Sequence, residues 1–156
     1  MKRTMLRAVV AIAATVALII PAVALASPGS GVGSIVTVSD GTLAGPIKVN
    51  LPDQIKLQTA GDVRVFSQTL TIQAGGSTGW HSHPGPVLVT VVHGTFRYQE
   101  SDCSFVDYTT GQTVLDSGGG HVHIGRNVGS DVLSLAVTYL IPVGEAPRID
   151  VPAVDC

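Results

Sequence analysis

The sequence lacks the pattern of a helical protein. After Pro28, no stretch repeats apolar residues at positions i, i+3, i+4 and i+7 over three turns, which argues against a helical fold. Charged residues make up only 13% of the chain, and its nine Lys and Arg residues form no cluster beyond the N-terminal segment. A basic patch is the usual signature of a nucleic-acid-binding protein, so nucleic acid is not an expected partner.

The N-terminal segment has the three parts of a secretory leader. A short basic start is followed by an apolar run from Ala8 to Ile20, which Pro21 interrupts before the sequence AVALAS. The small residues of that sequence predict a signal peptide over residues 1–26, cut after Ala26. The apolar run is shorter than the roughly 20 residues of a membrane span, and no cysteine lies near the cut for lipid attachment. We therefore expect residues 27–156 to be secreted as one domain without membrane attachment.

Only two cysteines are present, Cys103 and Cys156, and both follow the leader. In an exported protein an even number of cysteines usually means a disulfide. The expected Cys103–Cys156 bond would stabilise the fold by about 4 kcal/mol in the chain-entropy model.

What the chain does contain is a series of short β-branched runs separated by Gly, Pro, Asp and Asn. Such regular punctuation predicts an all-β sandwich or barrel. No internal repeat or linker divides the chain, and residues 28–33 and the C-terminal tail are expected to be irregular arms. The expected strands cover residues 34–38, 46–51, 54–58, 62–73, 87–94, 95–100, 112–116, 121–125 and 131–141.

Four of the five histidines form two His-x-His pairs, His81 with His83 and His121 with His123. On an extended strand, residues i and i+2 point to the same face. A single histidine would be read as an ordinary polar residue, but four imidazoles brought together without a cation have no clear structural purpose. Imidazole is a ligand for zinc, copper, iron and nickel, so the two pairs predict a metal site.

The first histidine pair also belongs to a longer motif. Residues 75–94 resemble the first motif of the cupin superfamily, G-x5-H-x-H-x3–4-E-x6-G, with Gly75, His81, His83 and Gly94 at the motif positions.

The second histidine pair lies in a stretch that resembles the second cupin motif. In residues 118–127, Gly120, His123 and Asn127 match the pattern P-x-G-x2-H-x3-N, while Gly118 replaces its proline. The two motifs occur in the family's order and close together, which is typical of a small single-domain cupin.

This resemblance implies an all-β fold, a conical antiparallel β-barrel of the cupin or jelly-roll type with a metal inside near one mouth. Carried over to this sequence, the ligands are His81, His83 and His123. The motif's glutamate position is occupied by Val87, which cannot bind a metal.

Two histidines could be considered as a fourth ligand. His93 follows Val87 by six residues, which is roughly 20 Å along a strand, so it is expected to lie at a hairpin turn instead. His121 has the same parity as His123, and it is the alternative fourth ligand. Otherwise water or a substrate takes the open position.

The expected chemistry follows from the missing carboxylate. Three neutral imidazoles leave the charge of a divalent ion uncompensated, which favours small anionic organic ligands, and open positions are typical of catalytic sites. The resemblance suggests a metal-dependent dioxygenase with iron(II), although nickel, manganese, copper and zinc fit the same ligands. A Lewis-acid isomerase or hydrolase is a weaker alternative. The other class of function is a non-catalytic extracellular cupin that binds a metal or a small ligand.

Residues around the motifs add three expectations. Asp116 is followed by Ser117 and then by three glycines. It could orient a histidine ligand or simply begin a turn. Val87, Val89 and Val91 are expected to line an apolar cavity suited to a small molecule. A homodimer formed through sheet edges is compatible with the sequence.

Overall fold

The computed structural model describes residues 26–156, in which every regular element is a β-strand. The predicted leader, residues 1–26, lies outside the described residues except for Ala26. No helix long and apolar enough to cross a membrane is found in the part of the chain that the structure describes. The strands are β1 (Ser30–Leu43), β2 (Ile47–Leu51), β3 (Ile55–Thr59), β4 (Val63–Ser77), β5 (His81–Ser82), β6 (Val87–His93), β7 (Thr95–Glu100), β8 (Phe105–Thr109), β9 (Thr113–Asp116), β10 (His123–Asn127), β11 (Leu133–Pro142) and β12 (Ile149–Asp150).

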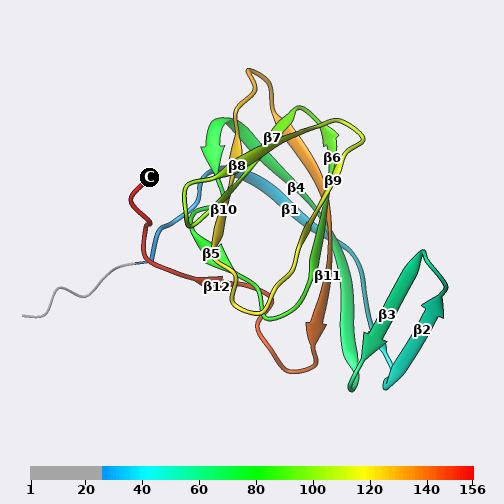
Figure 1. The fold of residues 1–156 in the computed structure, drawn as a ribbon. Helices are drawn as coiled ribbons and strands as arrows, with labels where there is room; N and C mark the ends of the chain where they lie inside the picture. The colour runs from blue at the N-terminus through cyan, green and yellow to red at the C-terminus, as the bar shows by residue number, and fades with distance from the viewer. Residues whose placement is uncertain (1–25) are drawn as a thin grey trace, which may run out of the picture.

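Ten of these strands form one antiparallel sheet that curls into a nearly closed barrel (Figure 1). The sheet runs in the order β12-β5-β10-β4-β11-β6-β9, with β1 also paired to β4 and the β7–β8 hairpin attached to β10. The β2–β3 hairpin is a separate two-stranded sheet that projects beside the barrel in Figure 1. The predicted all-β antiparallel barrel is confirmed.

Alternating side chains of the longer strands fill the barrel. In β11, Leu133, Leu135 and Val137 are buried, whereas the residues between them are partly exposed. This period of two is expected for a strand with one face toward a core. The buried core consists of Ile72, Val87, Val91, Phe96, Tyr98, Val114, Leu133, Leu135 and Val137.

Several strand boundaries differ from those expected. Residues 28–33 were expected to be an irregular arm, but β1 begins at Ser30. Irregularities in its pairing with β4 occur around Gly31 and Gly33. The strand expected over residues 121–125 begins only at His123. Strands β8 and β12 were not predicted, since β12 is two residues long and four of the five residues of β8 are exposed. Such short or exposed segments carry no clear alternating pattern.

The C-terminal tail packs against the barrel and is fixed there by a disulfide. Strand β12 pairs with β5, so that Asp150 lies opposite His81. Beyond it, Cys156 is bonded to Cys103, the two Cα atoms being 5.6 Å apart. The predicted disulfide is confirmed, and it holds the tail beside the strand that carries the first histidine.

Replacing both cysteines, Cys103→Ser and Cys156→Ser, should lower the free energy of unfolding by about 4 kcal/mol, because the unfolded chain regains the freedom of a loop of that length. Urea denaturation of the double variant and the wild type measures the difference. Equal stabilities, or two thiols that can be alkylated in the native oxidised protein, would contradict the expectation.

Candidate metal centre

The two histidine segments meet because strands β5 and β10 are hydrogen-bonded neighbours. His81 lies directly opposite His123 in this antiparallel pair. The turn before β10 is also hydrogen-bonded to the segment after β5, since the Gly120 N–H donates to the His83 carbonyl at 3.1 Å. Residues about forty positions apart in the sequence therefore present their side chains to the same space.

Glycines set the direction of the chain on both sides of the site. Gly79, just before β5, has a φ of 74°, and a Cβ there would collide with the backbone carbonyl of Ser27. Gly118 has a φ of 69°, and a Cβ there would collide with the backbone of Gly85. Both turns therefore require glycine.

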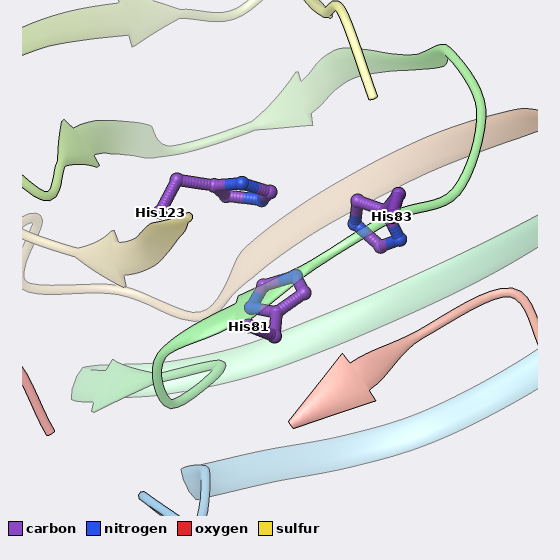
Figure 2. A group of neighbouring side chains, drawn as sticks. All are labelled: His81, His83 and His123. Carbon is purple, nitrogen blue, oxygen red and sulfur yellow. The ribbon is translucent and has the colours of Figure 1, made fainter. Parts of the chain in front are cut away.

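His81, His83 and His123 converge inside the barrel (Figure 2). Their exposed fractions are 5%, 5% and 4%, and the ring centroids of His81 and His123 are 4.3 Å apart. One nitrogen from each ring can be chosen so that all three lie within 4.8 Å of one another. Ligands about 2.1 Å from a common ion are separated by at most roughly twice that distance, so the three histidines could hold a metal ion with little movement.

Hydrogen bonds fix the orientation of all three rings. Each Nδ1 lies next to a backbone carbonyl: that of Gly79 for His81 at 2.9 Å, that of Pro147 for His83 at 2.5 Å, and that of His121 for His123 at 3.3 Å. A metal-binding histidine commonly donates its second ring nitrogen in this way, which selects the tautomer. With Nδ1 protonated in each ring, the Nε2 atoms carry the free lone pairs.

The buried rings are neutral at physiological pH. Burial, together with the neighbouring His123 and Arg148, lowers the pKa of His81 to about 2. Burial likewise lowers the pKa of His123 to about 4, against the opposing effect of Asp116. The pKa of His83 is also lowered, chiefly by burial. Because histidine binds metals in its neutral form, no proton has to be displaced before an ion binds.

The other two histidines lie apart from this group. His121 precedes β10, its side chain is 44% exposed, and its Nε2 lies 3.0 Å from Glu100 Oε2. It therefore does not share a strand face with His123, as the sequence pattern had suggested. His121 does belong to a second group, with Asp116 and His123, whose donor atoms also lie within 4.8 Å of one another. His93 is exposed at the end of β6, in agreement with its expected place before the hairpin turn.

The three rings line a cavity of about 70 Å³ inside the barrel. Of the valines expected there, Val87 and Val89 line it, whereas Val91 lies in the core. The remaining lining combines apolar and polar side chains: Leu70, Thr78, Phe96, Tyr98, Leu135, Val137, Tyr139 and Arg148, together with Gly125.

Two polar residues of the cavity carried no signal in the sequence. Arg148 comes from the tail expected to be an irregular arm, and its guanidinium donates to the Thr78 carbonyl at 2.7 Å and to Asp150 at 2.6 Å. The hydroxyl of Tyr98 is buried and has no hydrogen-bond partner among the described residues. Burial and nearby carboxylates raise the pKa of Tyr98 well above its ordinary value, so it stays a hydrogen-bond donor.

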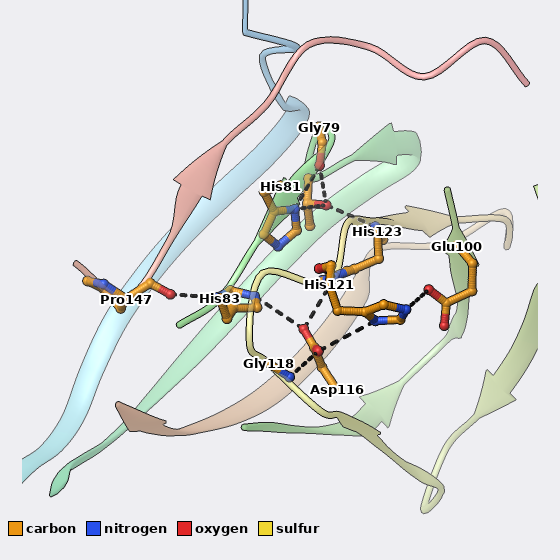
Figure 3. Close-up of polar contacts among 11 residues, drawn as sticks. Gly79, His81, His83, Glu100, Asp116, Gly118, His121, His123 and Pro147 are labelled. Carbon is orange, nitrogen blue, oxygen red and sulfur yellow. Dashed lines mark hydrogen bonds and ion pairs between the residues drawn. The ribbon is translucent and has the colours of Figure 1, made fainter. Parts of the chain in front are cut away.

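Asp116 is the carboxylate nearest to the cluster (Figure 3). It is 1% exposed, and its Oδ1 accepts a hydrogen bond from the Gly118 N–H at 2.8 Å. Its Oδ2 lies 3.2 Å from His123 Nδ1 and 3.9 Å from His83 Nε2. Asp116 thus starts the turn before the glycines, as one of the two interpretations expected, and its carboxylate also lies beside the histidines.

The chain matches no family model and no curated protein, but it resembles solved structures. A cupin-like protein from Thermotoga maritima is 22% identical over 62% of this chain and 80% of its own length, with a TM-score of 0.51. An uncharacterized conserved protein with a double-stranded β-helix domain from Klebsiella pneumoniae is 19% identical over 57% of this chain and 76% of its own, with a TM-score of 0.49. An oxalate decarboxylase from Lactobacillus farciminis, solved with formate, is 17% identical over 56% of this chain and 26% of its own, also with a TM-score of 0.49.

The similarity to the Thermotoga maritima structure, together with the nearly closed antiparallel barrel, establishes the fold as cupin-type. At such low identity these similarities carry no information about activity, which has to be argued from the residues of the site.

The metal-free protein should lose stability as the pH falls below about 6.5, the ordinary pKa of histidine. In that range the unfolded chain takes up protons on His81 and His123, while the folded chain keeps both rings neutral until its own lower pKa values are reached. Each ring should contribute up to about 1.4 kcal/mol per pH unit. Urea unfolding between pH 7 and pH 4.5 measures the slope, which His81→Gln should reduce. An unchanged slope in that variant would contradict burial of a neutral His81.

Proposed function

We propose that this cupin-fold chain binds one divalent metal ion through His81, His83 and His123. We further propose that the ion and Arg148 together bind a small anionic organic molecule. The observation that carries the proposal is the convergence of three buried, neutral imidazoles whose Nδ1 atoms are all held by backbone carbonyls.

The charge of the site supports an anionic ligand. Three neutral ligands leave the charge of a bound ion in place, and no acidic side chain lines the cavity in the described part of the chain. Arg148 reaches the cavity wall with its Nε paired to Asp150, and its charge acts on the rings of both His81 and His83. The unpartnered Tyr98 hydroxyl supplies one further donor, which an anion oxygen could accept.

The size of the cavity favours a small molecule. A water molecule needs roughly 10–15 Å³ of such space, so the cavity of about 70 Å³ holds only a few non-hydrogen atoms beside the ion. Valine and leucine side chains make up much of the wall. A short carboxylate or diketone matches this combination better than a sugar or a nucleotide.

For the reaction we propose oxygenation of such a molecule, with iron(II) as the first choice of metal. Nickel, manganese, copper and zinc suit the same imidazole ligands. When bound, the metal would supply adjacent open positions for a substrate anion and O2. In this scheme Arg148 holds the anionic end of the substrate, while Val87 and Val89 keep the reacting atoms away from bulk water.

A second candidate, a non-catalytic binding protein, is favoured by one observation. Among the described residues that line the cavity, only tyrosines, the histidine ligands and Arg148 can ionise, and the pKa values of Tyr98 and Tyr139 are raised by burial. The cavity therefore has no carboxylate suited to general acid–base catalysis, which a Lewis-acid isomerase or hydrolase would be expected to need.

We also propose that the protein acts outside the cell, as one domain of residues 27–156 released by cleavage after Ala26. The Cys103–Cys156 disulfide supports this, because such bonds persist mainly in oxidising compartments.

The metal-free protein should bind one zinc or nickel ion in isothermal titration calorimetry. His81→Ala, His83→Ala and His123→Ala should each weaken binding by about 100-fold or more, because loss of a ligand should exceed the 10–100-fold cost of losing a residue that only supports one.

His93→Ala is the matched control, since His93 is an exposed histidine at the end of β6 and should leave affinity unchanged. His121→Ala should change affinity less than about threefold; a large loss would make His121 a fourth ligand. If the wild type binds no metal, or if the His81 and His83 variants bind as well as it does, the assignment is wrong.

The iron(II)-loaded protein should consume oxygen in the presence of one or more members of a panel of short carboxylates and diketones. An oxygen electrode measures the rate, which His81→Ala should abolish and which Arg148→Gln should reduce mainly through a higher KM. Metal-dependent binding of a panel member without oxygen uptake would reject the oxygenase and support the non-catalytic alternative.

A further inference from the structure

The position that lacks the motif's glutamate faces a different acid across the sheet. Val87 in β6 is paired directly with Asp116 in β9. In an antiparallel pair, opposite side chains leave the same face of the sheet with Cβ atoms about 5 Å apart. The side chain of Asp116 therefore starts next to the place from which a glutamate at position 87 would have started.

The carboxylate of Asp116 is buried, and only one of its two oxygens accepts a hydrogen bond. It is 1% exposed, and only its Oδ1 has a hydrogen-bond donor, the Gly118 N–H. Its Oδ2 is buried without a hydrogen-bond partner among the described residues, although His123 Nδ1 is 3.2 Å away. A buried carboxylate oxygen without a partner is costly, so a turn-forming role alone does not account for it.

We propose that Asp116 supplies the carboxylate that position 87 lacks, and that it acts on the metal through His123. This inference rests on the proposed metal site. Asp116 is a positioning residue: its negative charge lies against Nδ1 of His123, keeps the proton on that nitrogen, and leaves Nε2 as the ligand. The arrangement is a carboxylate–histidine–metal triad of the kind that raises the basicity of the ligand.

Action through His123 fits the distances better than direct ligation. The donor atoms of the three histidines lie within 4.8 Å of one another, and Asp116 is not part of that group. Its Oδ2 is closer to the outer nitrogen of His123, at 3.2 Å, than to the Nε2 of His83, at 3.9 Å.

Asp116→Asn tests this role with little change in shape. The amide oxygen can still accept from the Gly118 N–H, so the amide nitrogen takes the place of Oδ2 and turns a donor toward His123 Nδ1. That arrangement favours the tautomer with the proton on Nε2, so that this nitrogen has no lone pair for an ion held with His81 and His83. We expect zinc affinity measured by calorimetry to fall by about 10–100-fold.

Glu100→Gln is the matched control. Glu100 also has a buried oxygen without a hydrogen-bond partner and is paired with His123 across the sheet, but its carboxylate forms its ion pair with His121, at 3.0 Å. The same loss of charge there should change zinc affinity less than about threefold. Equal affinities of Asp116→Asn and wild type, or equal losses in the two variants, would overturn the proposal.

A measurement on the wild type keeps the proposal testable if Asp116→Asn does not fold. Long-range ¹H–¹⁵N NMR of the zinc-loaded protein should show His123 bound through Nε2, with a slowly exchanging proton on Nδ1. Zinc on Nδ1 of His123 would overturn the proposal, because the ion would then lie in the group formed with Asp116 and His121. If the wild type binds no zinc at all, the proposed metal site fails first; if it binds zinc normally and only the Asp116 result is negative, this inference alone fails.

Discussion

The antiparallel contact between β5 and β10 is the constraint on which the site depends. It sets His81 opposite His123, although β5 is only two residues long. Such a short strand cannot hold its place alone, and its other edge is held by β12 of the C-terminal tail. The tail also provides the Pro147 carbonyl for His83 and the Arg148 guanidinium at the cavity. The Cys103–Cys156 disulfide therefore secures both the chain end and one wall of the candidate metal centre.

Burial of the histidines determines what the site can bind. Desolvation keeps the rings of His81 and His123 neutral, so a cation can bind without competition from protons at neutral pH. Position 87 in β6 carries no carboxylate, but Asp116 lies directly opposite it in the paired strand β9. The negative charge of Asp116 lies beside His123, and Arg148 lies at the cavity. With a divalent ion bound, the site would still keep a net positive charge, which suits an anionic ligand.

The sequence predicts the fold and the three converging histidines well, because strand punctuation and the His-x-His spacing are local features. Its prediction for His121 assumed one continuous strand over residues 121–125, but Gly118, Gly119 and Gly120 all have positive φ and β10 starts only at His123. The positions of Asp116 and Arg148 depend on strand register and on the path of the tail. Both are set by contacts between distant residues, which no local pattern encodes.

The most direct test of the account is anomalous diffraction at the zinc absorption edge from crystals of the protein grown with zinc. The account predicts one strong peak inside the barrel, about 2.1 Å from a nitrogen of each of His81, His83 and His123, with His121 outside the coordination sphere. The absence of a peak in the barrel, or a peak bound by Asp116 and His121 in place of His81 and His83, would contradict it.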